Sequence, residues 1–298
     1  MEGPSLTLDA PPPRETATAP PRIVGSFRTQ RLLLAVVAAE LALIYAPTVL
    51  WLVDRWTMSV WHNAHGMLIP FIVAYFAYEE LRRVPPRGRD SSAWGFLFLV
   101  PAVALHALDM GIHTQLLSAA SLVVMLPGLS LLFLGWTRTR AIAFPLAFMV
   151  LMLPIPLALT EPLHLLLRQI ATAASASIVP LLGITAYTEG TTIHLADAIL
   201  VVGDACSGFS TLYAAGAVAA LTAYSCPAPW RRALVLLSAA PLAIAANIVR
   251  VVILVLVVHA TGVDVLSTWV HPASGMLTFA LSLPVIFWLG SPGGRRAV

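Results

Sequence analysis

The sequence contains no lysine and few charged residues of any kind. Only 10% of its 298 residues are charged and 59% are hydrophobic, whereas about a quarter of the residues in a soluble globular domain are charged. The basic side chains are all arginines, and the chain has a formal net charge of +3 at pH 7. This composition excludes an ordinary soluble fold, and no stretch is charged enough to form a separate soluble domain.

Cysteine is also scarce. Cys206 and Cys226 are too few for a disulfide framework, and they lack the clustered spacing of a structural zinc site. The histidines and acidic residues do not form a cluster of the H-x-x-H kind. We therefore expect neither a metal nor another cofactor. Arginines that are scattered along loops, rather than gathered on one face, argue against a nucleic-acid partner.

Long apolar runs recur from residue 31 onward, and each can cross a hydrocarbon core about 30 Å thick as a helix. The sequence predicts an all-α polytopic integral membrane protein with about eight transmembrane helices. These lie at residues 31–53, 65–78, 93–110, 115–136, 141–160, 206–225, 233–258 and 270–289. We expect one transmembrane domain over residues 31–290, a disordered cytoplasmic tail over 1–30 without a signal peptide, and a short cytoplasmic tail over 291–298.

The arginines also predict an orientation, because short cytoplasmic loops carry an excess of basic residues. With both termini in the cytoplasm, most arginines fall in cytoplasmic segments. Arg55 and Arg168 are then expected outside, and Arg250 within a span.

The longest outer connection covers residues 161–205. Its first half is predicted to be an amphipathic helix that lies on or re-enters the outer interface. Its second half has apolar residues in alternation at Ile193 and Leu195 and again at Ile199 and Val201, which is typical of short strands. We expect a small outer helix followed by a β-hairpin.

Cys206 lies in the segment GDACSGFSTL, residues 203–212, at the predicted start of the sixth span. A thiol in the first turn of a helix is close to the positive end of the macrodipole, which favours the nucleophilic thiolate, although an ionised Asp204 nearby would oppose this. Ser207 and Gly208 would allow close backbone approach and could present N–H groups to an oxyanion. Cys206 as a small apolar filler and Gly208 as a packing residue is an equally open interpretation.

Arg250 is the only charged residue inside a predicted span of the C-terminal half, and an intramembrane arginine is a functional hypothesis by default. The structural alternatives are a side chain that reaches to the interface, or a buried pair with an acid such as Asp204. Asn247 lies one helical turn earlier on the same face and could share a hydrogen-bond network with Arg250.

His271 begins the last predicted span, with Pro272 after it. A helix N-terminus disfavours the imidazolium form, which would keep the ring neutral and available as a base. The topology places Cys206, Arg250 and His271 toward the outer leaflet on three different helices. A thiol, a base and a cationic donor are the parts that covalent acyl transfer requires. His164, like His62 and His259, is expected to be incidental.

At these residues the sequence resembles the exosortases of the exosortase/archaeosortase group of membrane transpeptidases. The AC-SG block of that family matches Ala205 to Gly208, its N-x-x-R block matches Asn247 and Arg250, and its H-x-x-x-G block matches His271 and Gly275. Weaker matches are HG-x-x-x-P at His65, Gly66 and Pro70 and P-x-P at Pro154 and Pro156. The chain departs from many members at Ser210, where they have arginine.

The resemblance implies a cysteine transpeptidase or protease at the outer face of a bacterial inner membrane. Its substrates would be secreted proteins of the PEP-CTERM type, which end in a PEP-like motif, a transmembrane helix and a basic tail. Cys206 would be the nucleophile of a thioacyl intermediate, His271 would transfer protons, and Arg250 would stabilise the oxyanion or position the substrate. Supporting residues would be Ser207, Gly208, Asn247 and Gly275, and the acceptor nucleophile is not identified.

Two other classes of function remain open from the residues. A transporter would use Arg250 as an anion-binding charge and Glu40 as a coupling group, with Cys206 incidental. A lipid-modifying enzyme or a non-catalytic assembly factor for exopolysaccharide export would also accommodate many spans and an outer site.

Overall fold

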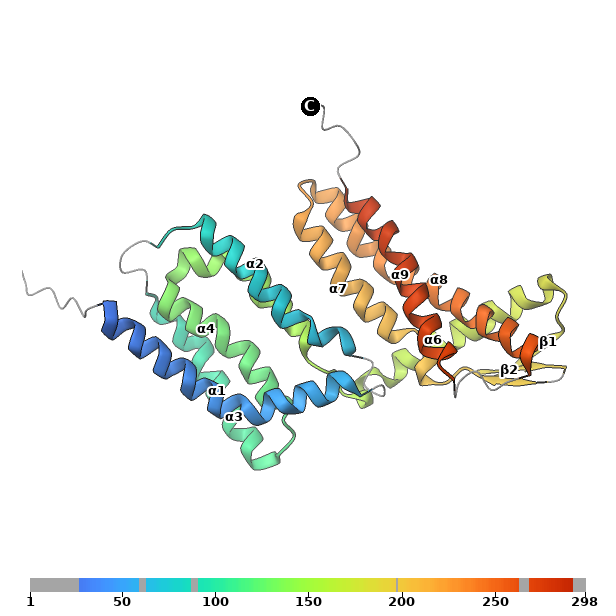
Figure 1. Ribbon diagram of the computed structural model, residues 1–298, viewed down its shortest axis with the longest axis horizontal. Helices are drawn as coiled ribbons and strands as arrows, with labels where there is room; N and C mark the ends of the chain where they lie inside the picture. Colours follow the sequence, from blue (N-terminus) through green and yellow to red (C-terminus); the bar gives the residue numbers. More distant parts are fainter. Residues whose placement is uncertain (1–26, 59–62, 87–90, 197, 263–267, 292–298) are drawn as a thin grey trace, which may run out of the picture. The chain divides into compact units, whose positions relative to one another are not determined.

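A computed structural model shows a mostly helical chain with one small sheet (Figure 1). It describes residues 27–58, 63–86, 91–196, 198–262 and 268–291. The predicted tails fall largely outside these ranges, so their expected disorder stays a prediction. By its internal contacts the chain divides into two compact units, Met1–Ile44 and Tyr45–Val298. All of the contacts discussed below lie within the second unit.

The N-terminal half is built from helices and short 3-10 turns. In chain order these are α1 (Phe27–Thr57), η2 (Ala64–Met67), α2 (Ile69–Arg83), η3 (Ala93–Gly95), α3 (Phe96–Ile112), α4 (Leu116–Ala141), α5 (Ala143–Phe148) and η4 (Met149–Met152). Leu52, Ile69, Phe148 and Met152 belong to one buried apolar cluster in this half. The first span is therefore confirmed as a helix, and it begins slightly earlier than predicted.

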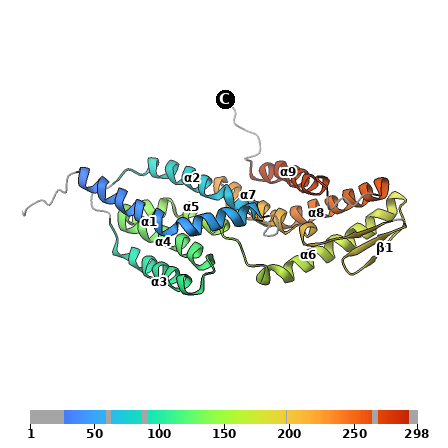
Figure 2. The same cartoon turned by 60° about the horizontal axis from the view of Figure 1, so that its bottom comes forward.

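The C-terminal half contains the longest helix and the sheet. Its elements are α6 (Leu157–Ile178), η5 (Val179–Leu182), β1 (Ala186–Glu189), β2 (Thr192–Leu195), β3 (Ile199–Val201), η6 (Asp204–Cys206), α7 (Phe209–Ser225), α8 (Pro229–Thr261) and α9 (Val270–Gly290). Helices α7, α8 and α9 contact one another pairwise (Figures 1 and 2). Buried Ala215, Ala219 and Ala223 of α7 let the helices approach closely, as small residues do between membrane helices.

Six helical segments of the described residues are long and apolar enough to cross a membrane. They are Ala35–Thr57, Ala93–Ile112, Leu116–Ala141, Ala158–Leu182, Pro229–Thr261 and Val270–Gly290. Two more predicted spans coincide with α2 and α7, which have 15 and 17 residues and are short for a hydrocarbon core that takes about 20. A multi-pass membrane protein is confirmed, whereas eight spans are not.

The predicted fifth span, residues 141–160, is wrong as a continuous helix. Helix α5 has six residues and η4 has four, and the chain is extended at Leu153 and Pro156 before α6 begins at Leu157. The cause is the pair Pro154 and Pro156, because proline lacks an N–H and pushes the residue before it out of the helical region. The helix expected to be a small outer element is instead α6, which with η5 has the length and composition of a span.

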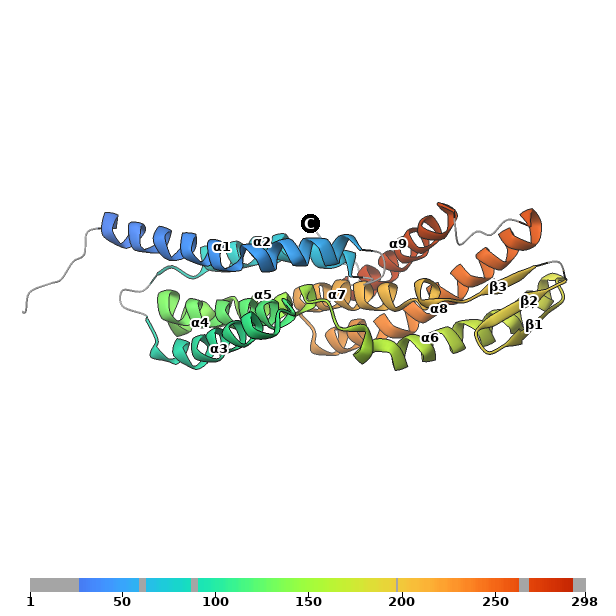
Figure 3. The same ribbon diagram turned by 90° about the horizontal axis from the view of Figure 1, so that it is seen from below.

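The predicted hairpin is present and has one more strand. β2 pairs antiparallel with β1 on one side and with β3 on the other, in the order β1-β2-β3. Ile193, Leu195 and Leu200 pack in one buried cluster with Val251 and Leu254 of α8. Figure 3 shows the sheet beside α6 and the C-terminal part of α8. Because β3 ends just before η6, the sheet fixes where the segment that contains Cys206 begins.

Candidate active site

Cys206 lies in a short turn between β3 and α7. The 3-10 turn η6 ends at Cys206, and α7 begins only at Phe209. Gly208 connects the two with φ of 81°, a conformation that favours glycine. The prediction that Cys206 opens the helix is therefore wrong by one turn, because the backbone changes direction at Gly208 before α7 starts.

His271 places its imidazole next to this turn. It lies in the first turn of α9, and its Nδ1 is 3.5 Å from the Sγ of Cys206, with Nε2 at 3.9 Å. Cys206 is only 2% exposed. The predicted nucleophile and the predicted base are thus in contact, although they are on separate elements.

Arg250 completes the group from the middle of α8, where it is buried. Its Nη2 is 3.1 Å from Nε2 of His271 and also donates to the carbonyl oxygen of His271 at 3.0 Å. Its Nε donates to Oγ of Ser274 at 3.1 Å. Ser274 in turn donates to the His271 carbonyl oxygen. Arg250 is therefore held against the first turn of α9 by three contacts, and it does not extend along the helix to an interface.

Two glycines make room for these polar side chains. A Cβ at Gly275 would lie 3.1 Å from Cζ of Arg250, and a Cβ at Gly208 would lie 2.5 Å from Cγ of Asn247. Asn247 donates from Nδ2 to the carbonyl oxygen of Cys206 at 3.0 Å. Asn247 thus contacts the Cys206 turn whereas Arg250 contacts the start of α9, so the shared network expected of these two residues stays a prediction. The three sequence blocks therefore interlock in pairs, Gly208 with Asn247 and Gly275 with Arg250.

The environment of the thiol differs from the expected one. Burial raises the pKa of Cys206, and the nearby Arg250 guanidinium acts in the opposite direction by stabilising the thiolate. The N–H of Ser207 donates to the carbonyl oxygen of Asp204 at 3.1 Å. This amide is therefore used within the turn, and in this conformation it does not serve the predicted oxyanion role.

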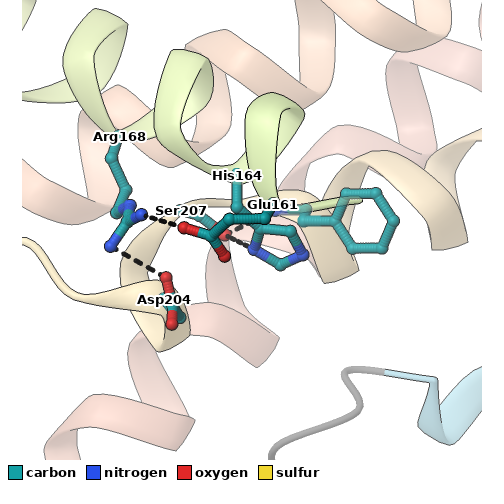
Figure 4. A network of polar contacts seen from close by, with 6 residues as sticks. Glu161, His164, Arg168, Asp204 and Ser207 are labelled. Atoms are coloured by element: carbon teal, nitrogen blue, oxygen red, sulfur yellow. Dashed lines mark hydrogen bonds and ion pairs between the residues drawn. The ribbon is translucent and has the colours of Figure 1, made fainter. Parts of the chain in front are cut away.

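A second group of polar contacts approaches the same turn from α6 (Figure 4). Arg168 forms ion pairs with Glu161 at 2.9 Å and with Asp204 at 2.8 Å. Nδ1 of His164 lies 3.0 Å from Oγ of Ser207. Asp204 therefore pairs with Arg168, and the alternative pairing of Asp204 with Arg250 is wrong. The prediction that His164 is incidental is not supported by this position.

The sequence did not predict this second group, because the residues of α6 and those of the Cys206 turn are about 40 positions apart in the chain. A signal was present, since the spacing of His164 and Arg168 places both side chains on one face of a helix. The other candidates lie elsewhere. His259 is exposed near the end of α8, and Glu40 is exposed on α1. His62 lies outside the described residues. Among the described residues, no group of three or more His, Cys, Asp or Glu side chains could hold a metal ion.

The weaker matched elements also pack together. A Cβ at Gly66 would lie 2.5 Å from Nε1 of Trp56. Trp56 donates from this nitrogen to the carbonyl oxygen of Met152 at 2.9 Å, just before the P-x-P element. The ring of His65 meets that of Tyr213 edge-on, with 4.6 Å between centroids. The HG element thus contacts both η4 and α7, the helix that follows the Cys206 turn.

Comparison with known families gives one match over most of the chain. The model of the transmembrane exosortases (Exosortase_EpsH) matches residues 56–288. This range covers most of the chain and includes every residue of the candidate site. Neither a curated protein nor a solved structure matches the chain significantly.

Proposed function

The chain belongs to the transmembrane exosortase family, and on this premise we propose that it is a cysteine transpeptidase or protease of a bacterial inner membrane. Cys206 is the nucleophile, His271 transfers protons, and Arg250 stabilises the oxyanion. The substrates are secreted proteins with a C-terminal PEP-like motif, a transmembrane helix and a basic tail. The reaction takes place at the periplasmic face.

The observation that carries this proposal is the meeting of three side chains from three separate elements. Cys206 Sγ is 3.5 Å from His271 Nδ1, and His271 Nε2 is 3.1 Å from Arg250 Nη2. These are distances at which a proton can pass between thiol and imidazole once a substrate tightens the geometry. A buried arginine beside a buried thiol also supplies positive charge where an anion would form.

The contact between Arg250 and His271 indicates the resting state of the imidazole. A guanidinium can only donate hydrogen bonds, so Nε2 of His271 is the acceptor and the neutral ring has its proton on Nδ1, the nitrogen nearer to Cys206. We expect the substrate carbonyl oxygen to replace Nε2 as the acceptor of Arg250. Proton exchange with a water molecule, which takes the proton from Nδ1 and gives one to Nε2, then leaves Nδ1 free to accept the thiol proton.

The chemical step follows from that exchange. As Nδ1 accepts the thiol proton, the sulfur of Cys206 forms a bond with the carbonyl carbon, and Arg250 stabilises the negative oxygen. When the C–N bond breaks, His271 returns the proton to the leaving amine. The product is a thioacyl-enzyme, which an acceptor nucleophile or water resolves.

The positions of the arginines in the sequence support the proposed orientation. A substrate with a basic cytoplasmic tail has its scissile segment at the opposite face of the membrane, because the positive-inside rule applies to it as well. In the predicted topology that face is also where Cys206, Arg250 and His271 lie.

The test is co-expression with a tailed substrate from the same genome, following the size and membrane release of the substrate. Wild type and Cys226→Ala should process it, and Cys206→Ala at matched membrane levels should not. A hydroxylamine-sensitive adduct between enzyme and substrate should form with wild type and with Cys226→Ala, and it should not form with Cys206→Ala. Equal processing by wild type and Cys206→Ala would reject the thiol mechanism and favour the transporter or assembly-factor alternative.

A further inference from the structure

The turn that carries Cys206 is held by side chains on both sides of the cysteine. Asp204 lies two residues before Cys206 and forms an ion pair with Arg168 at 2.8 Å. Ser207 follows Cys206, and its Oγ is 3.0 Å from Nδ1 of His164. Both partners come from α6, so this one helix contacts the turn two residues before and one residue after the proposed nucleophile (Figure 4).

The contact at His164 is buried and geometrically well defined. His164 is 1% exposed and Ser207 is 2% exposed. The imidazole also stacks on the ring of Phe209, with 4.4 Å between centroids. The N–H of Phe209 donates to Oγ of Ser207 at 3.3 Å. His164 is thereby connected both to Ser207 in the turn and to Phe209, the first residue of α7.

Arg168 contributes a different kind of contact. Its guanidinium bridges Asp204 and Glu161, and its side chain is 16% exposed whereas both carboxylates are more than half exposed. An ion pair with exposed carboxylates is worth little by itself. Its effect here is to fix the position of Asp204 relative to α6, in combination with the buried contact at Ser207.

The backbone of the turn does little to fix its own position. Within it, the N–H of Cys206 donates to Gly203 and the N–H of Ser207 donates to Asp204. These bonds define the local shape of the turn and leave its placement against α9 to side chains. A misplacement of about 1 Å between reacting groups can cost about 100-fold in rate, so the placement of Cys206 against His271 matters.

We propose that His164 and Arg168 are positioning residues, which hold the turn Gly203–Gly208 so that Cys206 stays buried and in contact with His271. The value of this placement for catalysis rests on the proposed function, whereas the placement itself can be tested without a substrate. The sequence blocks that the family shares supply Asn247, which holds the carbonyl of Cys206 from α8. The contacts from α6 hold the turn at two further residues, Asp204 and Ser207.

The first experiment measures the alkylation of both cysteines of the full-length protein by iodoacetamide in detergent, with peptides quantified by mass spectrometry. Cys226 is equally buried, at 2% exposure, and therefore serves as an internal control for folding. His164→Gln should increase the alkylation rate of Cys206 by about fivefold, which corresponds to the loss of one hydrogen bond, and should leave Cys226 protected. The exposed His259→Gln is the matched control and should change neither rate.

A conservative replacement separates positioning from general packing. The amide nitrogen of asparagine can occupy the place of Nδ1, whereas the longer glutamine places its amide near Nε2. His164→Asn should therefore keep Cys206 protected and retain most of the processing activity, whereas His164→Gln and His164→Leu should lower kcat by about tenfold or more with little change in KM. If His164→Asn and His164→Gln behave alike in both measurements, the proposal is wrong.

Unfolding of a variant would be recognised from the alkylation of Cys226, and a second variant would then take the place of the unfolded one. If alkylation of Cys226 rises together with that of Cys206, the His164 variant has unfolded, and Arg168→Gln becomes the deciding variant. It should increase alkylation at Cys206 alone by about twofold to fivefold. An unchanged rate at Cys206 in that variant would overturn the proposal. If wild type processes no substrate at all, the proposed function fails, while the alkylation results still decide whether α6 holds the turn.

Discussion

Helix α7 has a cysteine near each of its ends, and the two thiols are equally buried but have different neighbours. Cys206, just before the helix, contacts the imidazole of His271 and lies close to Arg250. Cys226, just after the helix, donates to the backbone carbonyl oxygens of Thr222 and Gly290, each at 3.2 Å. Both cysteines are free thiols. Burial therefore does not distinguish the proposed nucleophile Cys206 from Cys226, whereas the neighbours of the two thiols differ: only the thiol of Cys206 contacts ionisable side chains among those described.

The same contrast applies to α9, which contacts both ends of α7. At its start, His271, Ser274 and Gly275 form the surroundings of Arg250. At its end, Gly290 packs against Thr222, with which an added Cβ would overlap at 2.3 Å. One end of the helix pair thus gathers ionisable side chains, whereas the other makes a close packing contact in which the hydrogen bonds of the Cys226 thiol go to backbone oxygens. The predictions below test this difference between the two ends.

The largest effect is expected at the thiols. Cys206→Ala should lower processing by at least about 10³-fold, because it removes the proposed nucleophile. Cys226→Ala should change processing by less than about twofold, since it removes only bonds to backbone oxygens. The measurement is substrate processing at matched enzyme levels in membranes. A strong loss in Cys226→Ala with full retention of membrane levels would contradict the division between the two ends.

A smaller effect is expected when the guanidinium is replaced and the charge is kept. Arg250→Lys should lower kcat by about 10²-fold, because a lysine ammonium cannot make the forked contacts with His271 and Ser274 and also donate to an oxyanion. Steady-state kinetics on a purified tailed peptide would measure it. Near-wild-type activity would mean that charge alone is sufficient at this position.

The glycines of α9 provide a matched pair. Gly275→Ala should reduce activity by about tenfold through displacement of the Arg250 guanidinium, with little change in thermal stability. Gly290→Ala should do the reverse, lowering the melting temperature while the folded enzyme keeps its kcat. Melting curves and steady-state kinetics on both variants would show whether Gly275→Ala lowers mainly the activity and Gly290→Ala mainly the melting temperature. Equal behaviour of both variants would remove the distinction between a polar end and a packing end.

The mildest prediction concerns the pH dependence of the thiol. Burial raises the pKa of Cys206 and Arg250 lowers it, so Arg250→Gln removes the stabilisation of the thiolate. The pH profile of Cys206 alkylation should then shift to higher pH. At a fixed neutral pH the thiol should react more slowly in the variant. A shift to lower pH would contradict the proposed contact between the guanidinium and the thiolate.

The sequence predicted the helical membrane character and the short strands because these depend on local patterns. Apolar runs long enough to span a bilayer and the alternation around Ile193 act within one segment. The prediction failed at residues 141–160, where hydropathy outweighed Pro154 and Pro156 although those prolines end the helix. It also misplaced the start of α7, because hydropathy does not register the change of backbone direction at Gly208.

The three blocks could be recognised in the sequence, and their spacing within each helix already placed Asn247 beside Arg250 and His271 beside Gly275. That Cys206, Arg250 and His271 all lie toward one leaflet was also a sequence prediction. The roles of these residues stay predictions, which the experiments above address.

The sequence by itself determined that the protein is embedded in a membrane and that it forms apolar helices and short strands. These properties depend on composition and on periodicity over one or two helical turns. What only the tertiary structure decided is which distant groups meet. Asp204 could in principle have paired with Arg250 or with Arg168, and the choice depends on how α6 and α8 pack against the Cys206 turn. The same packing brings His164 to Ser207 and separates the surroundings of Cys206 from those of Cys226. Contacts of this kind come from the relative positions of whole helices, which no single segment of the sequence specifies.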